Sequence, residues 1–119
     1  MQYSFGERKK TMKSKYSAQI TTVDGIKFSS KLEAAFYRKL KIMKEHGDIK
    51  YFLRQVPFHL PGGVKYVVDF MIITENNQIR YIDVKGFDTP MSKAKRKIVE
   101  DLYPINIEIV KKWLVLKDS

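Results

Sequence analysis

The spacing of hydrophobic positions changes along the chain and separates predicted helices from predicted strands. Four apolar side chains recur at helical spacing, namely Leu32, Phe36, Leu40 and Met43. This period predicts a helix that begins after a cap at Ser29 or Ser30 and runs to about residue 46. Gly47 follows and favours helix termination.

Shorter apolar runs predict strands on both sides of this helix. Asp24-Gly25 favours a tight turn, so a hairpin should open the fold. After the helix, two apolar stretches end at the turn Pro61-Gly62-Gly63, and two longer strands flank a polar loop at residues 74–77. The predicted extended segments are residues 16–23, 26–28, 49–52, 56–60, 64–73, 78–85 and 105–110, with a further candidate at 113–116.

A second helix is predicted after Thr89-Pro90, because threonine caps free amides and proline fits the first turn. Its apolar face consists of Ala94, Ile98, Val99 and Leu102, and Pro104 closes it. The order is therefore helix, three strands, helix, strand (αβββαβ) after an N-terminal hairpin. This order predicts an α/β (α+β) fold in which helices flank one mixed sheet.

Composition narrows the class of partner. The 119 residues predict a basic tail at 1–15 and a single domain at 16–119, and 44% apolar content is enough for a core. A net charge of +10 attracts polyanions, and nucleic acid is the best candidate.

Without a membrane-spanning apolar run, a secretory signal or any cysteine, we expect a cytoplasmic protein with no membrane partner. Any metal site must then rely on carboxylates, which suit Mg²⁺ or Mn²⁺.

Two acids stand out in the predicted strands. Asp83 and Lys85 alternate with apolar residues, so both project from one strand face. The same acid-x-Lys pattern at Glu7-Arg8-Lys9 and Asp48-Ile49-Lys50 lies outside strands. Asp69 interrupts an apolar strand, where a lone carboxylate is costly unless a cation accompanies it.

The loop between the two long strands decides whether these acids meet. If the loop is centred on Asn76, paired residue numbers sum to 152 and Asp69 lies opposite Asp83. A two-residue turn at Asn76-Asn77 would instead pair Asp69 with Val84 and, without a bulge, place the acids on opposite faces. We predict the first register.

Each candidate also has a structural interpretation. Ser30 and Glu33 form a capping box, so Glu33 has a local role besides any catalytic one. Asp83 and Lys85 are also compatible with a charge pair on a solvated sheet face. The cations Lys93, Lys95, Arg96 and Lys97 are compatible with a solvated helix face, although their density beside the acids favours contact with phosphates.

Three segments together resemble the PD-(D/E)XK nuclease superfamily. They are Phe28-Ser29-Ser30-Lys31-Leu32-Glu33, Tyr66-Val67-Val68-Asp69-Phe70 and Ile82-Asp83-Val84-Lys85-Gly86. The chain is similar to small phage-encoded nucleases, including the phage endonuclease I type of Holliday junction resolvase. Val68 stands where the superfamily name has proline, and aspartate stands at 83 where glutamate is the alternative.

The resemblance implies a restriction-endonuclease-like core and hydrolysis of DNA phosphodiesters with Mg²⁺ or Mn²⁺. It implies that Glu33, Asp69, Asp83 and the carbonyl of Val84 ligate metal and that Lys85 acts on the attacking water. The helix cations and the tail residues Arg8, Lys9 and Lys10 would contact DNA. We expect a branched substrate such as a Holliday junction, and a homodimer. Other structure-specific or nicking nucleases and a non-catalytic DNA-binding module remain the alternatives.

Overall fold

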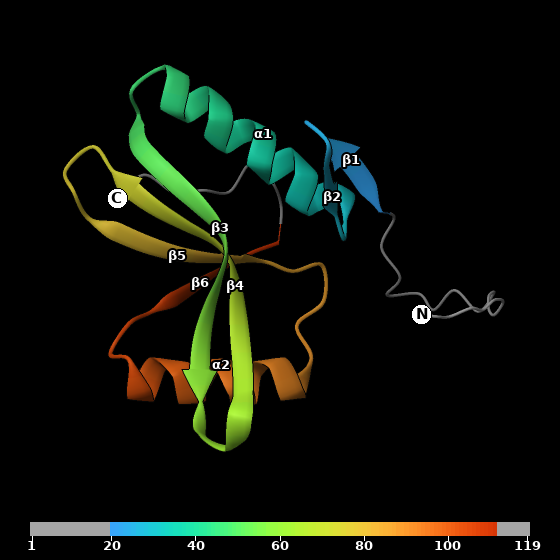
Figure 1. Ribbon diagram of the computed structural model, residues 1–119, viewed down its shortest axis with the longest axis vertical. Helices are drawn as coiled ribbons and strands as arrows, with labels where there is room; N and C mark the ends of the chain where they lie inside the picture. Colours follow the sequence, from blue (N-terminus) through green and yellow to red (C-terminus); the bar gives the residue numbers. More distant parts are fainter. Residues whose placement is uncertain (1–19, 112–119) are drawn as a thin grey trace, which may run out of the picture.

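An N-terminal hairpin packs on the first helix in the computed structural model, which describes residues 20–111 (Figure 1). Strands β1 (Thr21–Val23) and β2 (Ile26–Phe28) pair antiparallel, and the turn residues Asp24 and Gly25 have φ angles of 54° and 76°. The Asp24 carboxylate accepts hydrogen bonds from the Tyr37 hydroxyl at 3.0 Å and from the Lys41 ammonium at 2.5 Å. The predicted hairpin is confirmed over the described residues.

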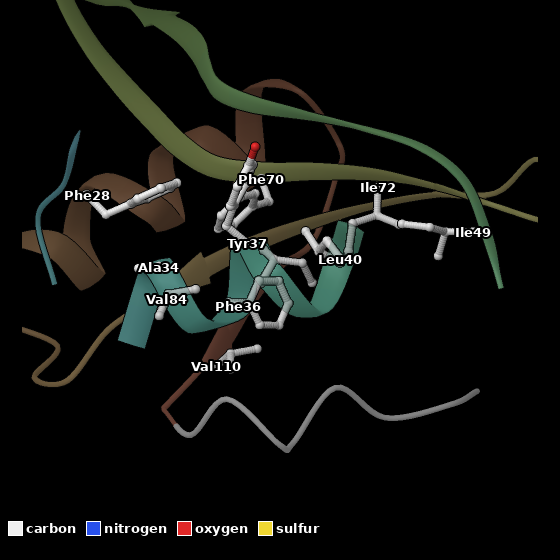
Figure 2. Close-up of a cluster of buried hydrophobic side chains, with 11 residues drawn as sticks. Phe28, Ala34, Phe36, Tyr37, Leu40, Ile49, Phe70, Ile72, Val84 and Val110 are labelled. Atoms are coloured by element: carbon white, nitrogen blue, oxygen red, sulfur yellow. The ribbon is translucent and has the colours of Figure 1, made fainter. Parts of the chain in front are cut away.

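Helix α1 (Lys31–Glu45) confirms the helical period. The Ser30 hydroxyl caps it by accepting the Glu33 N–H at 3.0 Å, and Gly47 follows its end with a φ of 80°. Its apolar face, including Phe36 and Leu40, is buried against the sheet in the first core cluster (Figure 2).

The sheet has four strands in the order β3-β4-β5-β6. Strands β3 (Ile49–Leu60), β4 (Val64–Thr74) and β5 (Ile79–Val84) are antiparallel neighbours, and β6 (Ile107–Val110) runs parallel to β5. The 3-10 turn η2 (Pro61–Gly63) joins β3 to β4, and helix α2 (Pro90–Leu102) connects β5 to β6. The mixed sheet flanked by two helices and the order αβββαβ are confirmed.

One strand prediction was wrong. Residues 49–52 and 56–60 belong to the single strand β3 rather than to two separate stretches. Pro57 did not break it because β3 lies at the sheet edge, where a missing N–H need not cost a ladder hydrogen bond. Within β3, Gln55 has a φ of 54°, a value that a non-glycine residue rarely adopts in a strand.

The register between β4 and β5 is the one in which paired numbers sum to 152. The pairs run from Ile73↔Ile79 to Phe70↔Ile82, and Thr74 N–H donates to the Gln78 carbonyl at 2.8 Å. Three residues therefore form the loop, as the odd-numbered turn required. Asn77, rather than the central Asn76, adopts the left-handed conformation, with a φ of 66°.

The long β3–β4 hairpin extends from α1 to α2 (Figure 1) and contributes to two separate cores. Phe70 packs in the cluster of α1, whereas Val68 packs with Val99 of α2. Residues two apart on a flat strand share a face, so β4 must twist locally between these positions. Asp69 occupies that twist, and the register places Gln55 opposite it.

Candidate active site at the junction of the two cores

The Glu33 carboxylate lies in the protein interior, although the residue belongs to the first turn of α1. Glu33 is only 4% exposed. Its two oxygens accept from the Ser29 hydroxyl at 2.9 Å and from Gln55 Nε2 at 3.4 Å. Its backbone N–H is capped by Ser30, as the capping-box interpretation predicted, but its carboxylate is bonded to other partners. Capping therefore does not account for this acid.

Two hydrogen bonds join Asp69 to the Asp83–Val84 segment of β5. The Asp69 N–H donates to Asp83 Oδ1 at 3.0 Å, and the Val84 N–H donates to Asp69 Oδ2 at 2.9 Å. Asp83 is 1% exposed. It is therefore not one half of a charge pair on a solvated face, and that alternative is wrong.

Electrostatics single out Asp69. The pKa of Asp69 is raised to about 7, mainly by burial and then by the negative charges of Glu33 and Asp83. The Val84 N–H and the Lys85 ammonium act in the opposite direction without cancelling the effect. Perturbed acids of this kind cluster at functional sites. The three acids from α1, β4 and β5 thus interact at one place, next to a lysine.

The donor chemistry of this place suits a hard divalent cation, with one restriction. Glu33 and Asp69 both approach Gln55 Nε2, at 3.4 Å and 3.5 Å, so a weak positive dipole lies between two carboxylates. Asp83 directs its other oxygen to the Tyr66 hydroxyl instead. Within residues 20–111 no three acidic or histidine side chains are spaced to hold a metal ion. Glu33 and Asp69, which share Gln55 as a partner, therefore fit such an ion best. Both oxygens of Asp83 already accept hydrogen bonds, from the Tyr66 hydroxyl and the Asp69 N–H.

Gln55 is a site residue that sequence reasoning missed. It belongs to the segment between the two predicted stretches of β3, and nothing in the local pattern marks it. Only the β3–β4 pairing brings it opposite Asp69. A positive φ at a non-glycine residue costs free energy, and such strained conformations cluster at functional sites.

Lys85 and Val84 lie next to Asp69 at the end of β5. Lys85 is half-buried, and its backbone N–H donates to the Val110 carbonyl of β6 at 3.0 Å. This bond fixes the strand end from which the Lys85 side chain projects. The Val84 peptide unit contacts Asp69 through its N–H, so the residue whose carbonyl was a predicted ligand does lie at the site.

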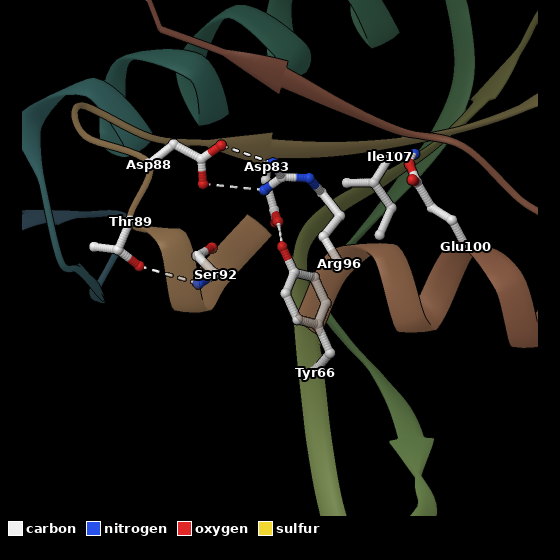
Figure 3. A network of polar contacts seen from close by, with 8 residues as sticks. All are labelled: Tyr66, Asp83, Asp88, Thr89, Ser92, Arg96, Glu100 and Ile107. Carbon is white, nitrogen blue, oxygen red and sulfur yellow. Dashed lines mark hydrogen bonds and ion pairs between the residues drawn. The ribbon is translucent and has the colours of Figure 1, made fainter. Parts of the chain in front are cut away.

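A buried polar network connects Asp83 to helix α2 (Figure 3). The Tyr66 hydroxyl donates to Asp83, and Arg96 hydrogen-bonds the same hydroxyl. Arg96 also forms a bidentate pair with Asp88, at 3.1 Å and 2.7 Å. That guanidinium holds the pKa of Asp88 below its ordinary value, whereas burial and then Asp83 raise the pKa of Tyr66.

The network corrects one predicted DNA contact. The Arg96 side chain is 12% exposed and bound to Asp88, so its charge is used inside the protein rather than on phosphate. The sequence did not reveal Asp88 as its partner. Lys93 and Lys97 are exposed on α2, and Lys95 is half-buried. The predicted contacts Arg8, Lys9 and Lys10 lie outside the described residues.

Comparison with known families assigns the chain to a group. A family model described as "Protein of unknown function (DUF1064)" matches residues 13–118. The chain belongs to the DUF1064 family. Comparisons with curated proteins and with solved structures find no significant match.

In this DUF1064 chain, the match spans every element that carries a candidate site residue. The site combines two buried acids, a half-buried aspartate, a half-buried lysine directly after β5 and a glutamine amide. None of the helices over residues 20–111 is long and apolar enough to cross a membrane.

Proposed function

We propose that the chain is a metal-dependent endonuclease that hydrolyses phosphodiester bonds of branched or otherwise structured DNA. One observation carries the proposal: Asp69 bonds the Asp83–Val84 segment and shares Gln55 Nε2 with Glu33, so that three acids meet near Lys85 in a protein of net charge +10. An excess of buried negative charge in a strongly basic chain favours a site for a cation that acts on a polyanion.

The mixed sheet with two flanking helices is compatible with a restriction-endonuclease-like core, which the sequence resemblance implies. In that core the helix-start glutamate and the two strand aspartates lie at one end of the sheet. The hydrogen bonds that join Asp69 to Asp83 and Val84 support this assignment.

Each residue has a distinct role in the proposed reaction. Glu33 and Asp69 would hold Mg²⁺ or Mn²⁺, with Asp83 and the Val84 carbonyl as the remaining candidate ligands. When bound, the ion lowers the pKa of a coordinated water and neutralises charge on the phosphate. Lys85 orients the attacking water by hydrogen bonding and stabilises the developing negative charge. The water loses a proton as its oxygen bonds to phosphorus. One P–O ester bond then breaks, and the leaving oxygen takes up a proton.

The test of this function is a cleavage assay on a panel of DNA substrates. Purified full-length chain would be incubated with a four-way junction, a flap and a linear duplex, with Mg²⁺ or with EDTA. We expect Mg²⁺-dependent cleavage that prefers the branched substrates. Paired cuts across the junction, together with a dimeric mass in solution, would support the homodimer.

The matched variants are Asp69→Asn and Asp48→Asn. Asp48 belongs to another acid-x-Lys sequence but is exposed in the turn between α1 and β3. We expect Asp69→Asn to abolish cleavage while junction binding persists, and Asp48→Asn to cleave normally. Junction binding without cleavage by the wild type under all metal conditions would favour the non-catalytic DNA-binding module instead.

A further inference from the structure

A pocket of about 280 Å³ adjoins the candidate active site. It lies between β4, the end of β5 and the first turns of α2. Its lining includes Lys85, which also belongs to the site, so the two are contiguous. The other lining residues are Lys65, Tyr66, Val67, Thr89, Met91, Ser92 and Lys95.

The pocket is built for an anion. Its three lysines are Lys65 of β4, Lys85 directly after β5 and Lys95 of α2, and no acid lines it. None of these ammonium groups forms an ion pair with another residue between positions 20 and 111. Three cations that line one pocket with no carboxylate among its other lining residues repel one another, so a bound anion would relieve this repulsion.

The polar side of the pocket is held in place by interactions that lie behind it. Thr89 Oγ accepts the Ser92 N–H at 3.0 Å and caps α2, and Ser92 also hydrogen-bonds Asp88. The buried Asp88–Arg96 pair anchors this turn to the body of the helix. The pocket wall is therefore preorganised, which lowers the entropy cost of binding.

We propose that this pocket is a phosphate subsite, which holds a phosphate group of the DNA strand next to the one that is cleaved. The inference rests on the proposed nuclease function for the identity of the strand. That the pocket binds a phosphate is inferred only from its lysines and its lack of acids, and does not depend on the nuclease function. Lys65, Lys95 and the first turn of α2 bind this phosphate, and Lys85 lies between it and the acids. The subsite fixes the position of the strand so that the neighbouring phosphate reaches Glu33 and Asp69.

Binding to the metal-free protein tests the subsite separately from cleavage. The full-length chain in EDTA would be titrated with the dinucleotides TpT and pTpT and with inorganic phosphate, and followed by backbone amide NMR shifts. The variants are Lys65→Met and Lys95→Met, which remove the charge but keep most of the side-chain length. Lys27→Met is the control, because Lys27 is an exposed strand lysine on the separate hairpin.

We expect saturable shifts at residues 65, 89, 92 and 95, with dissociation constants about tenfold weaker in each pocket variant and unchanged in the control. Binding of TpT, whose single phosphate is an internal phosphodiester, supports the subsite. Binding only of pTpT and inorganic phosphate identifies a site for a terminal phosphate and overturns the assignment to an internal phosphate of the strand. Equal weakening in all three variants, or no saturable shift at these residues, would overturn it.

Failure of the subsite and failure of the nuclease proposal are distinguishable. A chain that binds the dinucleotides at this pocket but cleaves no DNA with Mg²⁺ keeps the subsite and loses the nuclease function. If Lys65→Met and Lys95→Met each cleave DNA as well as the wild type, the nuclease function stands and the subsite is lost.

Discussion

Replacing Asp69 by asparagine is expected to stabilise the metal-free protein. Asp69 has a folded-state pKa of about 7, compared with an ordinary value of 3.8. A carboxyl whose pKa is raised by folding contributes full stability below 3.8 and loses it as the pH rises through about 7. Above that pH, the charged carboxylate destabilises the folded chain by up to about 4 kcal/mol.

Asparagine removes this charge without changing the shape of the side chain. Its carbonyl can still accept the Val84 N–H that Asp69 Oδ2 now accepts at 2.9 Å. Its amide nitrogen can donate toward Glu33 or the Gln55 carbonyl after a rotation of that side chain. We therefore expect most of the electrostatic gain to appear as stability at pH 8 and less than about 1 kcal/mol of it at pH 4.

The assay is thermal and urea unfolding in EDTA at pH 4 and pH 8, with Asp48→Asn as the exposed control. A gain of this size raises the melting temperature of a domain this small by at least about 10 °C at pH 8. Added Mg²⁺ should stabilise the wild type but not Asp69→Asn. A variant less stable than the wild type at pH 8, or a difference that does not change with pH, would show that the charge of Asp69 does not destabilise the fold.

Three further outcomes follow from the structure. Asp88→Asn should lower the free energy of unfolding at pH 7 by about 1–3 kcal/mol, because the Arg96 pair is lost. Since the pKa of Asp88 is lowered, this difference should fade as the pH falls below 3.8 in urea titrations, and a constant difference would contradict it. Tyr66→Phe should cost about 1–3 kcal/mol in urea unfolding by leaving a buried Asp83 oxygen without its donor; unchanged stability would exclude that role. Junction binding should weaken steeply with salt, and Lys65→Met should reduce the slope of log K against log salt by about 1. A flat salt response would mean that the positive charge is not used on DNA.

Local chemistry made much of the fold predictable. Short-range sequence features predict the Ser30 cap, the helical period up to Gly47 and the register of β4 with β5. That register matters most, because it places Asp69 directly opposite Asp83 on the neighbouring strand. A shift by one residue would place Asp69 opposite Val84 instead.

The features that were missed depend on tertiary pairing. The continuity of β3 across Pro57 follows from its place at the sheet edge, which no local pattern encodes. Gln55 reaches the site only because β3 pairs with β4. The sequence places Arg96 among the exposed cations of the helix, whereas the loop after β5 brings Asp88 into an ion pair with it. The hydrogen bond from Tyr66 to Asp83 likewise depends on the pairing of β4 with β5.

Two lysines in the same acid-x-Lys sequence pattern separate a catalytic role at the candidate site from a general effect of positive charge. Lys85 follows Asp83 at the candidate site, whereas Lys50 follows Asp48 and bonds Asn77 at 2.6 Å on the surface. Single-turnover cleavage of a four-way junction with Mg²⁺ would be measured for Lys85→Ala and Lys50→Ala. We expect a rate loss of at least about 100-fold for Lys85→Ala and a normal rate for Lys50→Ala. Equal rates for the two variants would contradict the assignment of the site.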